Sequence, residues 1–286
     1  MNSVNTFIGR SPLAAYFVIA FAFTWAILGL AVLAAQGIIA LPLSATVLIT
    51  IATLGPAVAA ILVVWVEGGR SSVRALLAQA GRWRVKPIWY AIALIGPALV
   101  MLAAFLLWRV LGGPALSPPP LNAWISVPIL VVVLLIPALF EEIGWRGLAL
   151  PRLQSRYGAL AASLIIGIAW AAWHLPIWFI PEAGFNSLPF PIFAAFTLAV
   201  SVLFTWLYNG SGGSVLLPAL AHAAINAMVL PWNTAVYLLP EAERGLHLQI
   251  PVTAVLVVLA VLLVWRTNPR TLTARTTQLK QTREAL

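Results

Sequence analysis

The stretch that decides the fold reads Phe140-Glu141-Glu142-Ile143-Gly144-Trp145-Arg146-Gly147, and it closes an apolar run that begins near Val127. A charge at the centre of a bilayer costs at least ~2.5–3.5 kcal/mol, so two adjacent carboxylates beside such a run are expensive. The chain has only seven acidic residues, all of them glutamate, and two stand side by side here. We therefore expect Glu141 and Glu142 to face a protein interior or a wet cavity and to have a function there.

The composition is that of an integral membrane protein. Of the 286 residues, 62% are hydrophobic and only 8% are charged, whereas about 25% of the residues of soluble domains are charged. The formal net charge is +9, but the basic residues gather beside the ends of apolar runs, which indicates contact with lipid head groups and no nucleic-acid partner. The chain has no cysteine, which excludes disulfides, a thiol nucleophile and thiolate metal ligands.

The apolar runs predict an all-α polytopic bundle of eight transmembrane helices, in a single integral membrane domain that covers residues 1–286. The predicted spans are 13–35, 44–66, 87–111, 124–150, 159–180, 192–208, 215–230 and 250–265. The first span exceeds the apolar core of a secretory signal, which has about 7–15 residues, and we expect it to be retained. Residues 267–286 are expected to form a basic cytoplasmic tail that is ordered only in part.

The distribution of basic residues predicts the orientation. Twelve of the sixteen lysines and arginines lie in the connections 67–86 and 151–157 and in the tail from Arg266. The connections 36–43, 112–121 and 181–191 hold none. Eight spans place these two sets on opposite sides of the membrane, and the positive-inside rule then puts both termini in the cytoplasm.

The acidic stretch contains a candidate ion pair and a candidate base. Glu142 and Arg146 are four residues apart, with the glutamate nearer the N-terminus, which is the favourable order on a helix. Glu141 is turned by about 100° from Glu142, the angular step of an α-helix, and points elsewhere. A buried ion pair that only fixes helix packing would explain Glu142 and Arg146. That interpretation leaves Glu141 without a partner, and we expect it to act as a base.

Two other apolar runs each carry a polar pair at helical spacing. Trp170 and His174 are four residues apart in the fifth run, and His222 and Asn226 are four apart in the seventh. Each pair would share one face of its helix, and each taken alone is also typical of hydrogen bonding between membrane helices. The remaining histidine, His247, is expected to be solvated in a loop.

A shared site of these residues would suit amide hydrolysis without a serine or cysteine nucleophile. A carboxylate and an imidazole can orient a water and take its proton. A second histidine and an amide can donate hydrogen bonds to a developing oxyanion. Glu141, His174 and His222 also match the ligand set of some hydrolytic zinc sites, so a bare water and a metal-bound water both remain open.

The depth of the fifth run constrains such a site. At ~1.5 Å per residue, His174 lies about 27 Å along a helix from Arg156, whereas Glu141 lies about 16 Å from Arg152. The fifth helix must therefore begin outside the hydrocarbon or tilt to meet the fourth. We expect a bend near Pro176 to help bring the residues together.

These motifs resemble a known family. Glu-Glu-x-x-x-Arg from Glu141, aromatic-x-x-x-His from Trp170 and His-x-x-x-Asn from His222 follow one another in the order found in the CPBP family. That family groups the CAAX prenyl endopeptidases with bacteriocin-processing and immunity-type membrane proteins. The resemblance covers a motif-bearing core at about residues 127–230. Trp170 stands where the family usually has phenylalanine, and we expect this departure to leave the chemistry unchanged.

The resemblance implies an intramembrane protease whose catalytic cavity faces the cytoplasm, in a bacterial-type inner or plasma membrane. It implies that Glu141 and His174 activate the attacking water, and that His222 and Asn226 stabilise the oxyanion. The two residues that would support the site are Glu142 and Arg146.

The resemblance also bears on cofactors and partners. No obligatory cofactor is expected, and zinc held by the two histidines and Glu141 is the alternative. The expected partners are the lipid bilayer and a membrane-associated peptide or protein substrate. Two other functions remain open: a proton-coupled transporter, because intramembrane Glu and His residues also form proton relays, and a non-catalytic scaffold or immunity protein that uses the same cavity.

Overall fold

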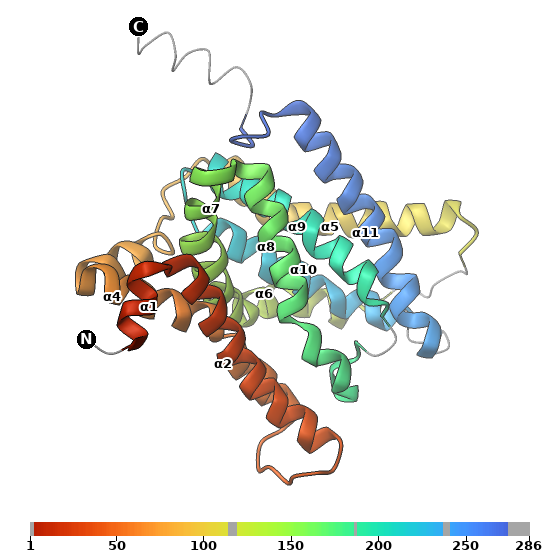
Figure 1. Ribbon diagram of the computed structural model, residues 1–286. Coiled ribbons are helices and arrows are strands. Elements are labelled where there is room, and N and C mark those ends of the chain that lie inside the picture. The colour runs from red at the N-terminus through yellow and green to blue at the C-terminus, as the bar shows by residue number, and fades with distance from the viewer. Residues whose placement is uncertain (1–2, 114–118, 186–187, 237–240, 274–286) are drawn as a thin grey trace, which may run out of the picture.

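The computed structural model describes residues 3–113, 119–185, 188–236 and 241–273, and Figure 1 shows how they are arranged. Within these residues all the regular elements are helices, as predicted. In chain order they are α1 (Ser3–Arg10), α2 (Pro12–Ala35), α3 (Ala45–Ala52), α4 (Gly55–Ala78), α5 (Pro87–Val110), α6 (Leu121–Glu142), the π-helix η1 (Ile143–Ala149), α7 (Leu150–Tyr157), α8 (Ala159–Trp173), the 3-10 helices η2 (Leu175–Phe179) and η3 (Pro181–Ala183), α9 (Phe190–Gly210), α10 (Leu216–Val236) and α11 (Glu241–Arg266).

The apolar helices confirm the multi-pass membrane fold. In the described part of the chain, seven helical segments are long and apolar enough to cross a membrane, and α10 adds a shorter apolar stretch at Leu216–Val229. These eight segments coincide with the eight predicted spans. The position expected for His247 was wrong, because α11 already begins at Glu241. The start of α11 is polar and shows no apolar periodicity, so the sequence pattern did not predict it. Acidic residues in a first turn nevertheless favour the start of a helix.

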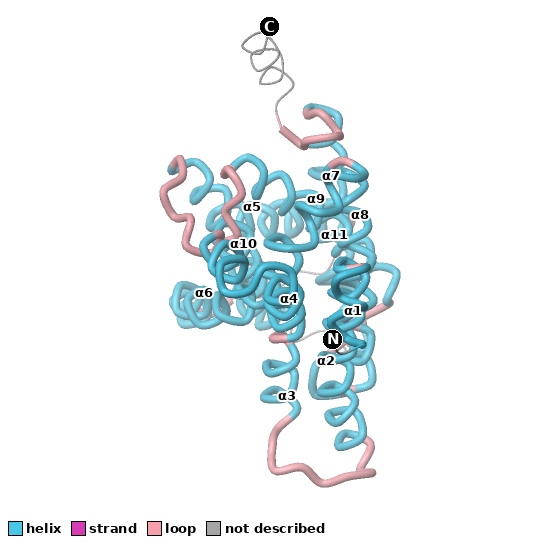
Figure 2. Tube along the Cα trace, turned by 60° about the vertical axis from the view of Figure 1, so that its left-hand side comes forward, coloured by secondary structure: helices cyan, strands magenta, loops and turns pink. Residues whose placement is uncertain are grey.

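The second predicted span is two helices rather than one. Figure 2 shows α2 and α3 side by side, joined by the loop of residues 36–44. The helix is interrupted between α3 and α4. There the Thr24 hydroxyl donates a hydrogen bond of 2.8 Å to the carbonyl of Ala52. Helix ends leave such carbonyls unpaired, so this contact from α2 stabilises the break. A second change of direction occurs within α4 at Gly68 and Gly69, where φ is +60° at Gly69.

The fifth predicted span changes from an α-helix to a 3-10 helix near Pro176, where a bend was expected. Helix α8 stops at Trp173, His174 caps it, and the chain continues as the 3-10 helix η2. The other end of α8 is held by the C-terminal segment: the amides of Ala159 and Leu160 donate to the carbonyls of residues 270 and 269 at 2.8 and 2.9 Å. Residues 267–273 therefore belong to the folded body, and residues 274–286 of the predicted tail lie outside the described residues.

The π-helix η1 follows the two glutamates directly. All ten residues at 141–150 are buried, and Trp145 packs edge-on against the rings of Tyr16 and Trp173, with centroids 5.8 and 6.1 Å apart. π-Helical turns are rare and are frequent at functional sites. The close fit depends on Gly144, because a Cβ there would stand 2.5 Å from the Pro56 Cβ and 2.6 Å from the Pro56 carbonyl oxygen of α4.

We predict that Gly144→Ala destabilises the protein, since the new methyl group meets backbone atoms of α4 that cannot rotate away. Overpacking of this kind costs about 1–3 kcal/mol. The measurement is the apparent melting temperature of the purified protein in detergent. Gly96→Ala in α5 is the matched control, because a Cβ there meets nothing within 4 Å. Equal melting temperatures for the two variants would contradict the close contact.

Candidate active site

A cavity of about 400 Å³ brings the predicted site residues together. Its walls come from α2, α3, α6, α8, η2, α9 and α10. Glu141, His174, His222 and Asn226 all line it. The predicted convergence of three distant segments is therefore present, while the chemical role of each residue stays a prediction.

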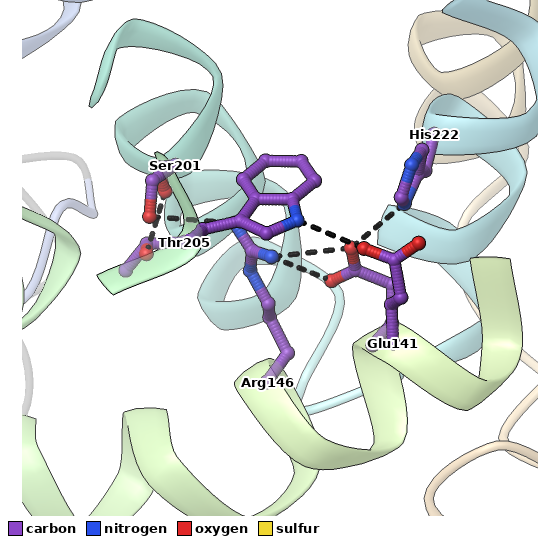
Figure 3. A network of polar contacts seen from close by, with 7 residues as sticks. Glu141, Arg146, Ser201, Thr205 and His222 are labelled. Atoms are coloured by element: carbon purple, nitrogen blue, oxygen red, sulfur yellow. Dashed lines mark hydrogen bonds and ion pairs between the residues drawn. The ribbon is translucent and has the colours of Figure 1, made fainter. Parts of the chain in front are cut away.

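Glu142 belongs to a buried charge cluster with Arg146 and His222, both of which are labelled in Figure 3. Its side chain is fully buried. Nη1 of Arg146 lies 3.1 Å from Oε1 of Glu142 and 3.0 Å from Oε2, so the predicted ion pair is formed. Nδ1 of His222 lies 3.1 Å from the same Oε1. The carboxylate thus joins the π-helical segment to α10.

Helix α9 supplies partners of Arg146 that sequence reasoning missed. Nη2 of Arg146 donates to the Ser201 hydroxyl at 3.3 Å, and the guanidinium carbon lies 5.1 Å from the ring centroids of Trp170 and Phe204. The signal in the sequence was a hydroxyl pair, Ser201 and Thr205, spaced four residues apart in an otherwise apolar helix. Polar side chains at such positions commonly bind a neighbouring helix.

Glu141 is held by a different partner. The indole Nε1 of Trp170 donates a hydrogen bond of 2.8 Å to Oε2 of Glu141. The side chain is 5% exposed and lines the cavity. Phenylalanine has no donor for this carboxylate, so the tryptophan adds a contact to Glu141 that the resemblance did not imply. That the departure leaves the chemistry unchanged stays a prediction.

His174 and His222 each make their polar contact through the same ring atom, Nδ1. Nδ1 of His174 lies 2.8 Å from the carbonyl oxygen of Trp170. A carbonyl can only accept, so Nδ1 carries a hydrogen and Nε2 of the neutral ring is an acceptor. Nδ1 of His222 contacts the Glu142 carboxylate in the same way, so its other ring nitrogen, Nε2, takes no part in that contact.

Asn226 is more exposed than the other three residues. It stands one helical turn beyond His222 on α10, lines the cavity and is exposed. Its amide is therefore at the rim of the cavity, whereas His222 is 6% exposed and lies at the floor.

The arrangement does not fit the zinc alternative as the side chains stand. Among the described residues, no three His, Cys, Asp or Glu side chains are grouped closely enough to hold a metal ion. Glu141, His174 and His222 share a cavity wall, but one oxygen of Glu141 already accepts the Trp170 hydrogen bond.

The cavity extends in one direction from the charge cluster. On α6 its lining continues from Glu141 only toward Leu134, and on α10 it continues from His222 only toward Val229. Both directions lead to the helix ends whose connections hold few basic residues. The side of the membrane to which this cavity opens, expected from the resemblance to be the cytoplasm, stays a prediction.

Comparison with known proteins supports the resemblance to the CPBP family. Residues 122–228 match the sequence model of the Rce1-like family, type II CAAX prenyl endopeptidase Rce1-like. The "CAAX prenyl protease 2" of Methanococcus maripaludis is 37% identical over 110 residues, which are 35% of this chain and 39% of that relative. The chain thus spans about two fifths of the length of the curated relative it matches. The family match includes all three motifs.

We predict that Arg146→Met is strongly destabilising, because it leaves the Glu142 carboxylate buried without its main counter-charge. Removing one partner of a buried pair costs about 3–5 kcal/mol. The matched control is Arg152→Met, which breaks the Glu67–Arg152 pair, where both side chains are about 30% exposed; exposed pairs contribute about 0–1 kcal/mol. The apparent melting temperature of each variant in detergent is compared. Similar losses in both would show that burial does not decide the strength of the pair.

Proposed function

We propose that this chain, whose residues 122–228 match the Rce1-like family, is an intramembrane endopeptidase that hydrolyses a peptide bond with an activated water. The observation that carries the proposal is the shared cavity of Glu141, His174, His222 and Asn226. The name of the curated relative adds support, because it also describes a protease.

Glu141 and His174 are proposed to bind the attacking water. The Trp170 indole occupies Oε2 of Glu141, which leaves Oε1 to accept a hydrogen bond from a water in the cavity. Nε2 of His174 accepts a second hydrogen bond and orients the oxygen lone pair. Glu141 takes one proton as the water oxygen bonds to the substrate carbonyl carbon, and it returns this proton to the amide nitrogen as the C–N bond breaks.

His222 and Asn226 are proposed to stabilise the tetrahedral intermediate. The Asn226 amide donates from the rim, and Nε2–H of protonated His222 donates from the floor. The Glu142 carboxylate, 3.1 Å from Nδ1 of His222, orients the ring, and Arg146 holds that carboxylate in place. Donors fixed in advance in a site that excludes bulk water give the largest share of catalysis in many acyl-transfer enzymes.

The cavity wall indicates an apolar substrate segment. Three phenylalanines of α9 at positions 193, 196 and 204, together with Ile177 and Ile225, line the space beside the polar groups. We propose a membrane-associated peptide or protein as the substrate, bound with apolar side chains against this wall. The bacterial-type membrane and the cytoplasmic position of both termini belong to the same proposal.

We predict that Glu141→Gln and His174→Ala each lower cleavage of a susceptible membrane peptide by about 10²–10⁴-fold, the usual contribution of a positioned acid or base. Initial rates in detergent or proteoliposomes are compared with Glu182→Gln, which removes an exposed carboxylate in η3. An unchanged melting temperature controls for folding. Undiminished cleavage by Glu141→Gln would rule out this mechanism. Solute flux without peptidase activity would favour the transporter, and a wild-type cellular phenotype of Glu141→Gln would favour the silent scaffold.

We predict that Trp170→Phe lowers kcat with little change in KM, because it frees the Glu141 carboxylate from its 2.8 Å hydrogen bond. A hydrogen bond to a charged group contributes about 1.5–3 kcal/mol, which corresponds to about 10- to 100-fold in rate. Trp89→Phe makes the same truncation where the ring packs against Trp206 and is the control. A purely structural role for Trp170 would lower stability and leave the kcat of the folded fraction intact.

A further inference from the structure

Ser201 of α9 carries a buried hydroxyl that contacts the charge cluster without lining the cavity. Its side chain is fully buried, and its oxygen accepts a hydrogen bond of 3.3 Å from Nη2 of Arg146. The residues of α9 that line the cavity are Phe193, Phe196, Thr197, Val200 and Phe204. Because Ser201 is not one of them, any effect of its hydroxyl on the proposed reaction has to pass through Arg146.

A series of three polar contacts leads from Ser201 to the cavity. The first is the hydrogen bond from Arg146. Nη1 of Arg146 lies 3.1 Å from Oε1 of Glu142, and the same oxygen lies 3.1 Å from Nδ1 of His222. Figure 3 shows the Arg146 side chain between Ser201 and His222. Since His222 lines the cavity, the series ends on a ring that the proposed reaction uses.

The hydrogen bond to Ser201 fixes the plane of the Arg146 guanidinium group. Nη1 of that group is directed to Glu142 and Nη2 to Ser201, while the buried Nε has no hydrogen-bond partner among the described residues. The rings of Trp170 and Phe204, with centroids 5.1 Å from the guanidinium carbon, limit its position. A planar group held through Nη1 alone could still turn about that contact, and a second contact through Nη2 prevents the rotation.

Helix α9 is itself held in place beside Ser201. The Thr197 hydroxyl, one turn earlier, donates to the Gly167 carbonyl of α8 at 3.2 Å. The two helices also approach closely here, since a Cβ at Gly167 would stand 2.8 Å from the Cα of Leu198. Ser201 is therefore a fixed point of the bundle, and Arg146 is anchored to it.

We propose that Ser201 is a positioning residue of the site and acts on the ring of His222. By holding Nη2 of Arg146 it fixes the Glu142 carboxylate, and that carboxylate fixes the ring through Nδ1. This inference rests on the proposed function for the reaction in which His222 takes part, but the orientation of the ring rests on the contacts alone. The competing interpretation is a hydroxyl that only joins helices, as serines in membrane helices commonly do.

The first test measures cleavage of a susceptible membrane peptide. Ser201→Ala is expected to lower kcat about 2- to 10-fold with KM unchanged, the rate equivalent of one hydrogen bond. Ser201→Thr keeps a hydroxyl and is expected to restore kcat. Ser163→Ala is the matched control, because this serine of α8 is equally buried and donates within its own helix, to the Ala159 carbonyl at 2.7 Å. At equal melting temperatures, equal kcat values for Ser201→Ala and Ser163→Ala would overturn the proposal, and so would a kcat of Ser201→Thr as low as that of Ser201→Ala.

The second test needs no proteolysis. The chain has three histidines, so protein labelled with ¹⁵N-histidine gives few ring signals in proteoliposomes, and His222→Gln identifies those of His222. Ser201→Ala is expected to shift the ring-nitrogen resonances of His222 by more than those of His174, whereas Ser163→Ala leaves both in place. Unchanged His222 resonances in Ser201→Ala would overturn the proposal whether or not the protein cleaves peptides. Shifted His222 resonances in a protein without peptidase activity would overturn the proposed function and leave the positioning of the ring standing.

Discussion

The structure depends on one buried carboxylate, that of Glu142, whose charge must be paired. Glu142 is fully buried in a segment that the membrane surrounds, and an unpaired charge there would be prohibitively costly. Arg146 provides the counter-charge from the next turn, and His222 and Ser201 bring α10 and α9 to the same point. The cluster therefore fixes the relative position of the helices that form the cavity floor.

This constraint separates two glutamates that are neighbours in the chain. Glu142 is fully buried and contacts both Arg146 and His222. Glu141 has the Trp170 indole as its hydrogen-bond donor and the cavity beside it. Trp170 also positions His174 through its backbone carbonyl and packs edge-on against His222, with ring centroids 5.3 Å apart. Trp170 thus contacts the proposed base and both histidines. Phenylalanine at this position would keep the backbone carbonyl and an aromatic ring but would lose the indole donor to Glu141.

The parts of this site that the sequence predicted are local, and the parts it missed are not. The Glu142–Arg146 pair lies within one helical turn, so its spacing alone predicted it. The motif resemblance identified the residues that meet in the cavity. Ser201 and the Gly144–Pro56 contact depend on the rotation and approach of separate helices, which no single segment encodes. Which residues line the cavity likewise depends on how seven elements pack together, which no single segment encodes.

The buried segment at residues 141–150 bears on how any site that uses water can exist inside a membrane. A cavity that admits water must not connect both faces, since a continuous water path would conduct ions and protons. Residues 141–150 are all buried, and of them only Glu141 lines the cavity. Trp145 of this segment packs against Tyr16, and the Gly147 carbonyl accepts a hydrogen bond from Gln79. The segment that pairs Arg146 with Glu142 is therefore packed on the side away from the cavity, which leaves Glu141 as its contact with that space.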